Sequence, residues 1–268
     1  MSPVEHFPRV FGRMDGRSAL VTGASSGIGA AIARGFLDAG ARVHAVARRA
    51  DAMVQELGQD AVDDGRCVIH PVDVSDSAAM LALGAELAAT GPVDTLVCAA
   101  GFNIPKRRVA ELTVEAWDEL VAVNLNGAFY ALRATLDQIR ECNGDIVFIS
   151  SVTASWPDHA GAAYGATKSG LLGLARGAGI DEHGNGVRVT SVLPGIVNTA
   201  ILDKRPIPPT PELRRWMVQP EDIAQACLTA VTLPARTNIA EMTIVATRLQ
   251  ALAATQAANP ELPEGLDG

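Results

Sequence analysis

The sequence predicts a doubly wound α/β fold: a single domain in which a seven-stranded, mostly parallel sheet carries helices on both faces. Three observations lead to this prediction. The chain has 268 residues, 48% hydrophobic and 19% charged, which is enough to bury a full core. Short apolar or β-branched runs alternate with longer helical patterns. A glycine-rich loop joins the first run to the first helical pattern, where such sheets bind ligands.

Seven short runs are expected to be strands, because they are rich in apolar and β-branched residues and end at turn residues. They cover residues 18–22, 42–47, 66–71, 95–99, 145–150, 188–193 and 242–246. The helical patterns between them cover residues 28–39, 50–57, 77–90, 114–141, 162–181 and 220–233. A repeated strand–helix–strand order predicts crossover connections and therefore parallel strands.

No internal linker divides the chain, so we expect one catalytic domain over residues 17–250. Residues 1–16 would be an N-terminal extension and residues 251–268 a C-terminal tail. Residues 201–218 break the pattern, because four prolines in this segment exclude a regular helix interior or a central strand. We expect this segment to be an irregular insertion that serves as a substrate lid.

Composition excludes several classes of protein. The formal net charge of −8 argues against nucleic acid as a partner. No apolar run approaches the length of a membrane span, and the first 17 residues lack the apolar segment of a secretory signal. The four cysteines stand far apart, which predicts no metal site, no disulfide and a reducing, cytoplasmic location.

The glycine loop after the first strand has a spacing that suits a phosphate. Gly23 permits a tight turn, Gly27 removes a side chain where a phosphate must touch backbone, and Gly29 lets helix and strand pack closely. The free N–H groups at the start of the next helix would then face an anion. An ordinary strand-to-helix turn is the alternative interpretation.

This loop resembles the TGxxxGIG cofactor loop of the short-chain dehydrogenase/reductase family, and the resemblance runs from about residue 18 to residue 246. It implies a Rossmann-type domain that binds a nicotinamide cofactor. The contacts implied by the family pattern are made by Gly23, Ser25, Ser26, Gly27, Ile28, Gly29, Asp73, Val74, Ala99, Ala100, Gly101, Tyr164, Lys168, Pro194, Gly195, Val197 and Thr199. Asp73 could equally belong to a helix N-cap.

One segment departs from the family pattern. The family usually has Asn-Asn-Ala-Gly after the fourth strand, whereas this chain has Cys98, Ala99, Ala100 and Gly101. The missing asparagine amide would have braced the neighbouring backbone, so local stability and cofactor fit are in doubt here.

The end of the second strand favours NADP(H) over NAD(H). An NAD site wants a carboxylate there, but the chain has Ala47 followed by Arg48 and Arg49. A guanidinium suits a 2′-phosphate, and Arg48 is the better candidate of the two. The alternative is that both arginines merely start a solvated helix.

Tyr164 and Lys168 form the most specific catalytic pattern. At positions i and i+4 of a helix they lie side by side, so the ammonium is expected to lower the pKa of the phenol towards the working pH. Ser151 stands 13 residues before Tyr164, as in the family, and would donate to a carbonyl oxygen; Ser150 is the alternative. Asn124 resembles the family asparagine that positions a water beside the lysine.

The resemblance implies an oxidoreductase that interconverts a carbonyl and a secondary alcohol and that forms a dimer or tetramer through its two long helices. Glycines 165, 170, 173, 177 and 179 would permit close helix approach. The substrate is a small molecule. The basic clusters at residues 106–108 and 204–205 hint that it is anionic, although a solvated basic face explains them too. An NAD-linked polyol or sugar dehydrogenase and a catalytically silent NADP(H)-binding sensor stay open as alternatives.

Overall fold

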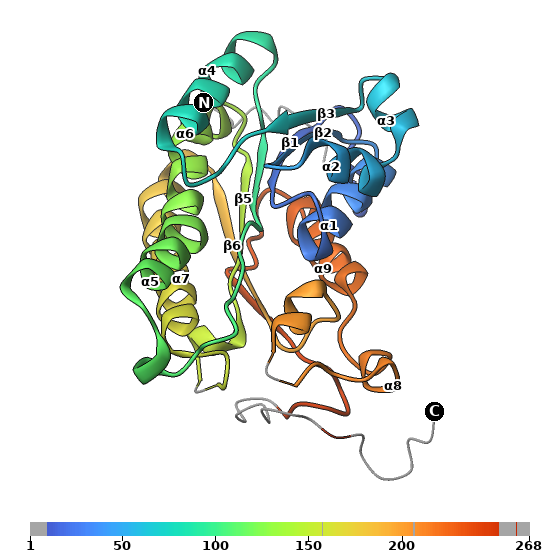
Figure 1. The fold of residues 1–268 in the computed structure, drawn as a ribbon. Helices are drawn as coiled ribbons and strands as arrows, with labels where there is room; N and C mark the ends of the chain where they lie inside the picture. Colours follow the sequence, from blue (N-terminus) through green and yellow to red (C-terminus); the bar gives the residue numbers. More distant parts are fainter. Residues whose placement is uncertain (1–9, 157, 206, 252–260, 262–268) are drawn as a thin grey trace.

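A seven-stranded sheet forms the middle of the molecule (Figure 1). The structure, a computed structural model, describes residues 10–156, 158–205, 207–251 and 261. Its strands are β1 (Ser18–Thr22), β2 (Arg42–Ala47), β3 (Cys67–Pro71), β4 (Thr95–Cys98), β5 (Asp145–Ile149), β6 (Arg188–Pro194) and β7 (Glu241–Ile244). The spatial order is β3-β2-β1-β4-β5-β6-β7, and every pairing is parallel. The predicted fold class is confirmed, with a sheet that is wholly rather than mostly parallel.

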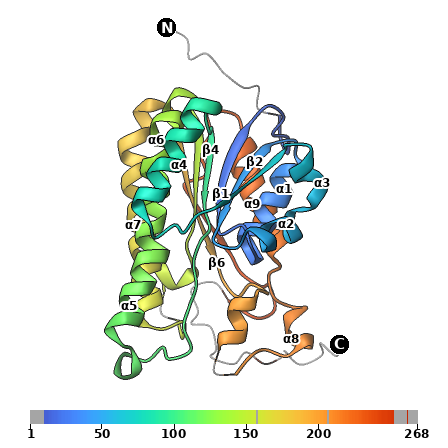
Figure 2. The same ribbon diagram turned by 45° about the horizontal axis from the view of Figure 1, so that its top comes forward.

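Two layers of helices cover the sheet (Figures 1 and 2). One layer is built from α1 (Gly27–Asp38), α2 (Ala50–Leu57), the short α3 (Gln59–Asp63) and α9 (Pro220–Thr232). The other is built from α4 (Ser77–Thr90), α5 (Val114–Val121), α6 (Gly127–Glu141) and α7 (Ala162–Glu182). The connection from β3 returns the chain to the other side of β1, so the strand order reverses between β1 and β4. Ligands of doubly wound sheets bind at the carboxyl ends of the strands at this point.

The strands are buried on both faces, which explains their nearly continuous apolar sequences. In β1, Val21 belongs to the core beneath α1 and α9, whereas the preceding Leu20 belongs to the core beneath α4 and α6. Both side chains are fully buried. Successive residues of a strand point to opposite faces, so one short strand contributes to two separate cores.

The predicted single helix over residues 114–141 is divided in two. A π-helical turn (Ala122–Asn126) separates α5 from α6 and contains the fully buried Asn124. A π turn inserts one extra residue into a helix, and it is rare and concentrated at functional sites. The apolar periodicity on either side continues through the turn, so the sequence pattern alone does not reveal it.

Residues 201–218 are less irregular than predicted. A 3-10 turn (Ala200–Lys204) and α8 (Pro211–Arg214) organise the described part of this segment. Pro211 occupies the first turn of α8, where a missing N–H costs nothing. Three further 3-10 turns span Val109–Glu111, Val152–Ala154 and His183–Asn185.

The described residues before β1 pack against the domain. Met14 is fully buried, and its N–H donates to the carbonyl oxygen of Ala39 at 2.7 Å. The N–H of Gly12 donates to the hydroxyl of Thr232 at 3.0 Å. The remainder of the predicted extension, residues 1–9, and most of the predicted tail lie outside the described residues.

Candidate active site

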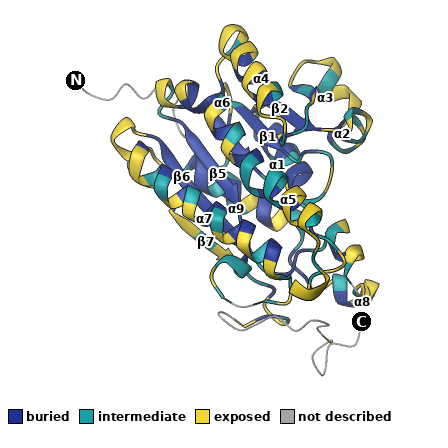
Figure 3. Ribbon diagram, turned by 60° about the vertical axis from the view of Figure 1, so that its left-hand side comes forward, coloured by how far each residue is buried: buried dark blue, intermediate teal, exposed yellow. Residues whose placement is uncertain are grey.

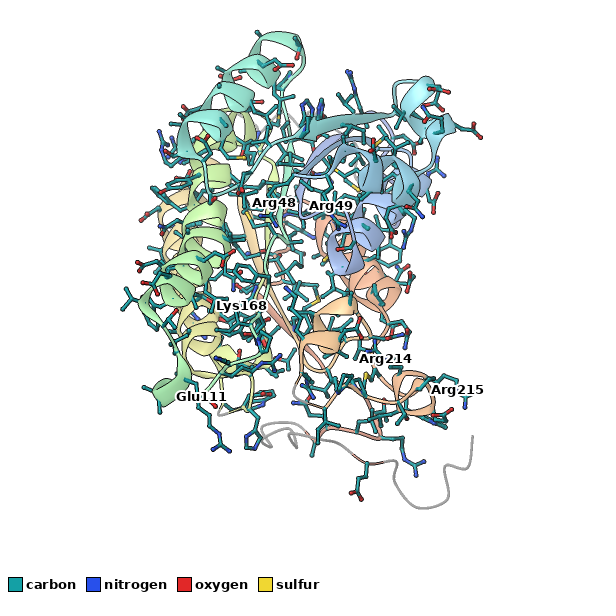
Figure 4. The ribbon with its side chains drawn as sticks, in the orientation of Figure 1. Arg48, Arg49, Glu111, Lys168, Arg214 and Arg215 are labelled. Carbon is teal, nitrogen blue, oxygen red and sulfur yellow. The ribbon has the colours of Figure 1, made fainter. Side chains whose placement is uncertain are left out.

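A cleft of about 870 Å³ opens at the carboxyl ends of the strands. Its walls contain every residue predicted above to bind the cofactor, including the glycine loop and Pro194, Gly195, Val197 and Thr199. Thr199 lies next to the glycine loop, since a Cβ on Gly27 would be 3.2 Å from its methyl group. They also contain Ser151, Tyr164 and Lys168. Of the predicted site residues, Asn124 alone is absent from the walls, because it is buried behind them. Figure 4 shows Arg48, Arg49 and Lys168 between the two layers of helices.

Two positions of the glycine loop, Gly23 and Gly29, have no room for a side chain. Gly23 has a φ of +74°, and a Cβ on it would lie 2.8 Å from the backbone of Ala100. A Cβ on Gly29 would lie 2.4 Å from the carbonyl oxygen of Gly23. Ser26, the residue before α1, is extended and makes no side-chain capping bond with the first turn of the helix. The loop therefore leaves backbone donors of α1 directed at the cleft, as a phosphate group requires.

Thr22 braces the segment where the family asparagine is missing. The hydroxyl of Thr22 accepts the N–H groups of Ala99 and Ala100 at 3.1 and 3.2 Å and donates to the carbonyl oxygen of Val97 at 3.3 Å. These bonds join the end of β1 to the end of β4. A hydroxyl on the neighbouring strand thus holds the backbone whose stability the sequence left in doubt.

Arg48 and Arg49 follow β2 at the wall of the cleft, and Asp73 is the acidic residue near Arg48. The guanidinium of Arg48 is 73% exposed and lies 3.9 Å from the carboxylate of Asp73. Arg49 approaches the hydroxyl of Ser25 at 3.5 Å. Asp73 accepts from the N–H and hydroxyl of Ser75 and is not a helix N-cap, because Asp76 caps α4. Both guanidinium groups are therefore accessible to an anionic group in the cleft.

The catalytic pattern is assembled on β5 and α7. The Lys168 ammonium donates to the carbonyl oxygen of Ile149 at 2.8 Å and lies 5.7 Å from the centre of the Tyr164 ring. Ser150 and Ser151 follow β5 and differ in their partners. The Ser150 hydroxyl donates to the carbonyl oxygen of Lys168 at 2.9 Å, whereas the Ser151 hydroxyl accepts the N–H of Thr153 at 3.3 Å and lies close enough to the phenol of Tyr164 to oppose the rise in its pKa. Ser151 is thus the serine placed to act with Tyr164.

The expected lowering of the pKa of Tyr164 is wrong for this structure. Burial raises the pKa of Tyr164 to about 12, and the nearby carboxylate of Asp158 adds to the increase, while Ser151 and Arg107 oppose it. Burial also lowers the pKa of Lys168 to about 8. Removal from water penalises the charged form of both groups more than their proximity favours it. The phenol is accordingly protonated at neutral pH.

Asn124 connects the loop after β4 to α7. Its side-chain oxygen accepts the N–H of Phe102 at 2.9 Å, and its amide nitrogen donates to the carbonyl oxygen of Phe102 at 3.0 Å and to the hydroxyl of Thr167 at 3.3 Å. A Cβ on Gly101 would lie 3.3 Å from the Asn124 oxygen and 3.4 Å from the Lys168 nitrogen. The Asn124 amide and the Lys168 ammonium therefore both lie next to Gly101.

The two basic clusters contribute to the cleft unequally. Arg107, Lys204 and Arg205 line it, whereas Lys106 and Arg108 are exposed and lie outside its walls. Two acidic residues line the same end, the half-buried Asp158 and the exposed Glu119. Asp158 was not predicted from the sequence to be a site residue. Its position between Ser151 and Tyr164, on the loop that joins two catalytic elements, is the signal that could have found it.

The segment over residues 201–218 is closed at its base. Val197 and Val218 pair as an isolated parallel bridge, and the N–H of Asn198 donates to the carbonyl oxygen of Val218 at 2.8 Å. Leu213 and Met217 are buried in the core beneath α1 and α9. Arg214 bonds to Asn198 at 3.1 Å and to Asp203 (Figure 4 labels Arg214). The two ends of this segment are therefore packed against the domain, while about half of its described residues are exposed.

The described ranges contain neither a metal-binding cluster nor a membrane-spanning helix. No group of three or more histidine, cysteine or acidic side chains there could hold a metal ion. No helix there is both long and apolar enough to cross a bilayer.

Comparison with known proteins agrees with the site. The family model described as short chain dehydrogenase matches residues 17–207. The chain is 34% identical to the NADP-dependent 3-hydroxy acid dehydrogenase YdfG of Salmonella typhi over 232 residues, covering 82% of this chain and 91% of that protein.

Solved structures extend the comparison to the fold. Serine dehydrogenase from Escherichia coli superposes with a TM-score of 0.73 at 33% identity, covering 85% of this chain and 97% of that one. An alcohol dehydrogenase from Thermococcus sibiricus in complex with 5-hydroxy-NADP superposes with a TM-score of 0.75 at 28% identity, covering 88% and 98%.

Proposed function

Because the chain belongs to the short-chain dehydrogenase/reductase family, we propose that it is an NADP(H)-dependent oxidoreductase that interconverts a carbonyl group and a secondary alcohol. One observation carries this proposal. Ser151, Tyr164 and Lys168 line the same cleft as a glycine loop built for a phosphate. The NADP-dependent relative and the structure with an NADP analogue support NADP(H) as the cofactor, as do Arg48 and Arg49.

Bound NADP(H) supplies or accepts the hydride. The residues of the chain deal with the proton and the carbonyl oxygen. In the reductive direction Ser151 orients the carbonyl and donates to its oxygen as negative charge develops there. Tyr164, protonated at neutral pH, gives its proton to that oxygen. The Lys168 ammonium stabilises the phenolate that forms, and Asn124 supports the path by which the proton is replaced.

The substrate is a small molecule, and we propose that it carries an anionic group. Arg107, Lys204 and Arg205 face the substrate end of the cleft against two acids. Residues 201–218 are proposed to be the lid over this end, moving through residues 204–210 because both ends of the segment are anchored. Hydrogen exchange that slows in residues 204–210 on addition of NADPH and substrate would support the lid; unchanged exchange would exclude it.

A homo-oligomer, a dimer or tetramer, is also proposed. Exposed residues occur along α5, α6 and α7 (Figure 3). They include the large apolar Val114, Trp117, Phe129 and Ile180. A Cβ on Gly165, Gly173 or Gly177 would meet no described atom within 4 Å, so the outer face of α7 is open to close approach. Light scattering measures the assembly. The four free thiols support a cytoplasmic location, which cell fractionation would check.

A turnover screen tests the proposed reaction. NADPH consumption is measured by absorbance with a panel of ketones, aldehydes and oxo acids, and NADPH affinity is measured separately. We expect consumption with at least one carbonyl class, and faster consumption with NADPH than with NADH. Tight NADPH binding with no turnover on any substrate would instead identify a silent NADP(H)-binding sensor. Preference for NADH with polyols would identify a polyol or sugar dehydrogenase.

A further inference from the structure

Arg107 lies beside the phenol of Tyr164. The two residues together line both the main cleft and a small adjoining void. The guanidinium is held in place by its own loop and by the lid, since Nε donates to the carbonyl oxygen of Ile104 at 2.8 Å and Nη2 approaches that of Lys204 at 3.5 Å. Both of these acceptors are neutral. The arginine is thus positioned by backbone and keeps its charge for an ionic partner at the cleft.

Asp158 is the acid that the fold places against this arginine. Its loop packs directly on Arg107, because a Cβ on Gly161 would lie 2.7 Å from the Cβ of Arg107. Asn103 holds the loop there by donating to the carbonyl oxygen of Ala160 at 2.9 Å. One carboxylate oxygen of Asp158 accepts the N–H of Ala160 at 2.8 Å. The charge of Asp158 acts on both Arg107 and Arg205.

We propose that the substrate is a small hydroxy or oxo acid whose carboxylate binds Arg107, close to the negative charge of Asp158. Arg107 then selects acids over neutral carbonyl compounds, and Asp158 limits how tightly they bind. This inference rests on the proposed function. It assigns the charge recognition to Arg107, whose neighbours Lys106 and Arg108 point away from the cleft.

A substrate carboxylate at Arg107 would be attracted by the guanidinium and repelled by the nearby carboxylate of Asp158. A guanidinium pairs with a carboxylate through two parallel N–H bonds, which fixes the orientation of the ligand as well as binding it. In a half-buried site two carboxylates repel each other strongly. Burial already raises the pKa of Asp158, although Arg205 and Arg107 oppose the increase. An incoming carboxylate therefore gains the attraction of Arg107 but meets the repulsion of Asp158, which weakens its binding.

Two substrates with the same carbonyl group, one an anion and one neutral, test the selection. 3-Oxobutanoate and ethyl 3-oxobutanoate present the same carbonyl group, but only the first is an anion. Initial rates at saturating NADPH give kcat and KM for each. We expect Arg107→Gln to raise the KM for the acid about 10- to 100-fold more than the KM for the ester, the loss of one charge-assisted pair. We expect Asp158→Asn to lower the KM for the acid severalfold.

Matched variants control for charge and for folding. Asp158→Asn removes the charge, yet the amide oxygen still accepts the N–H of Ala160, so the turn is kept. Arg108→Gln removes an exposed arginine next to Arg107 and is expected to alter neither KM. Arg107→Lys keeps the charge without the planar fork and should lose less than Arg107→Gln. NADPH affinity equal to that of the unmodified protein shows that each variant is folded.

A binding measurement separates this inference from the proposed function. Butanoate and butanamide are unreactive analogues whose binding is followed by calorimetry. Selective butanoate binding that is lost in Arg107→Gln and tightened in Asp158→Asn supports the inference, even if no carbonyl is reduced. Equal binding of both analogues, or an acid KM that Arg107→Gln does not change while ketones are still reduced, overturns the inference and leaves the oxidoreductase intact.

Discussion

At the amino ends of the strands, four charged side chains are buried among partners of their own chain, whereas at the carboxyl ends the buried polar groups face a cleft. Arg17, Asp94, Asp145 and Arg188 are each no more than 5% exposed. Arg17 pairs with Asp94 at 2.8 Å and with Asp145 at 2.7 Å, and Arg188 pairs with the other oxygen of Asp145 at 2.7 Å. This network joins β1, β5 and β6 to the segment before β4.

The backbone completes the same network. Arg17 also donates to the carbonyl oxygen of Val231 at 2.7 Å, and Ser18 donates its N–H to Asp94 at 2.6 Å. At the other end of the sheet the buried side-chain atoms that lack a partner within the described residues belong to Thr153, Trp156 and Gln250. All three follow strands at their carboxyl ends. The comparison teaches that the buried charges at the amino ends are paired within the fold, whereas unpaired buried polar atoms lie at the end of the sheet where the proposed active site is.

The largest expected effect breaks the chemistry and spares the fold. Tyr164→Phe removes the proposed proton donor, so kcat should fall by about 10²–10⁴ while NADPH affinity is retained. The free energy of unfolding should change by no more than about 1.5 kcal/mol, the loss of one hydrogen bond. Rates and urea unfolding are measured together. Tyr130→Phe on α6, outside the cleft, is the control, and a Tyr164→Phe protein with over a tenth of the activity would contradict the assignment.

A substitution at the amino ends of the strands should lower stability and leave the catalytic rate unchanged. Asp145→Asn leaves Arg17 and Arg188 buried without a shared carboxylate, which should lower the free energy of unfolding by about 3–5 kcal/mol. The folded fraction should keep its kcat and KM. Asp137→Asn, which removes an exposed partner of Arg140, should cost less than about 1 kcal/mol. Equal losses from the two substitutions would show that burial does not set the difference.

Two buried histidines provide a pH-dependent test of this comparison. His44 and His70 on β2 and β3 share a hydrogen bond of 3.0 Å. Burial, with His70 and Arg42, lowers the pKa of His44 to about 4. The folded protein keeps His44 neutral, so stability is present above pH 6.5 and falls as the pH drops from about 6.5 to 4, by up to about 3 kcal/mol.

Urea unfolding between pH 7.5 and pH 4.5 measures this loss. His44→Gln should flatten the profile, because the variant has one fewer buried group that gains a proton on unfolding. His183→Gln, which alters an exposed histidine, should leave the profile unchanged. A profile that His44→Gln does not alter would assign the acid sensitivity to other groups.

The smallest effect concerns the far end of the cleft. Arg48→Ala should weaken NADPH binding about tenfold, or about 1.4 kcal/mol, because the exposed guanidinium is screened by water. NADH affinity in the same variant is the control and should not change. Equal affinities for the two cofactors in the unmodified protein would contradict a role for Arg48.

Local patterns made the fold and part of the site predictable. The glycine loop, the Tyr164–Lys168 pair and the spacing to Ser151 each depend on residues close in sequence, and so do the alternating strands and helices. The π turn at Asn124 was missed because the apolar pattern passes through it. The inward position of Arg107 and the outward position of Arg108 depend on how one loop packs against Gly161, more than 50 residues away. The charge network depends on strand order, which joins Arg17 to a carboxylate 128 residues later.

Because Val197 and Val218 are bridged, the segment between them can be replaced without disturbing the rest of the fold. The two ends of this segment are paired to each other. Doubling the length of the loop between them would raise the entropic cost of closing it by only about 0.6 kcal/mol. The stretch between Lys204 and Thr210 lies between the two short helical turns and beside the substrate end of the cleft. If this segment is the proposed lid, we expect that grafting a stretch of another length or charge into it changes the substrate preference while the sheet, the glycine loop and Tyr164 keep their places.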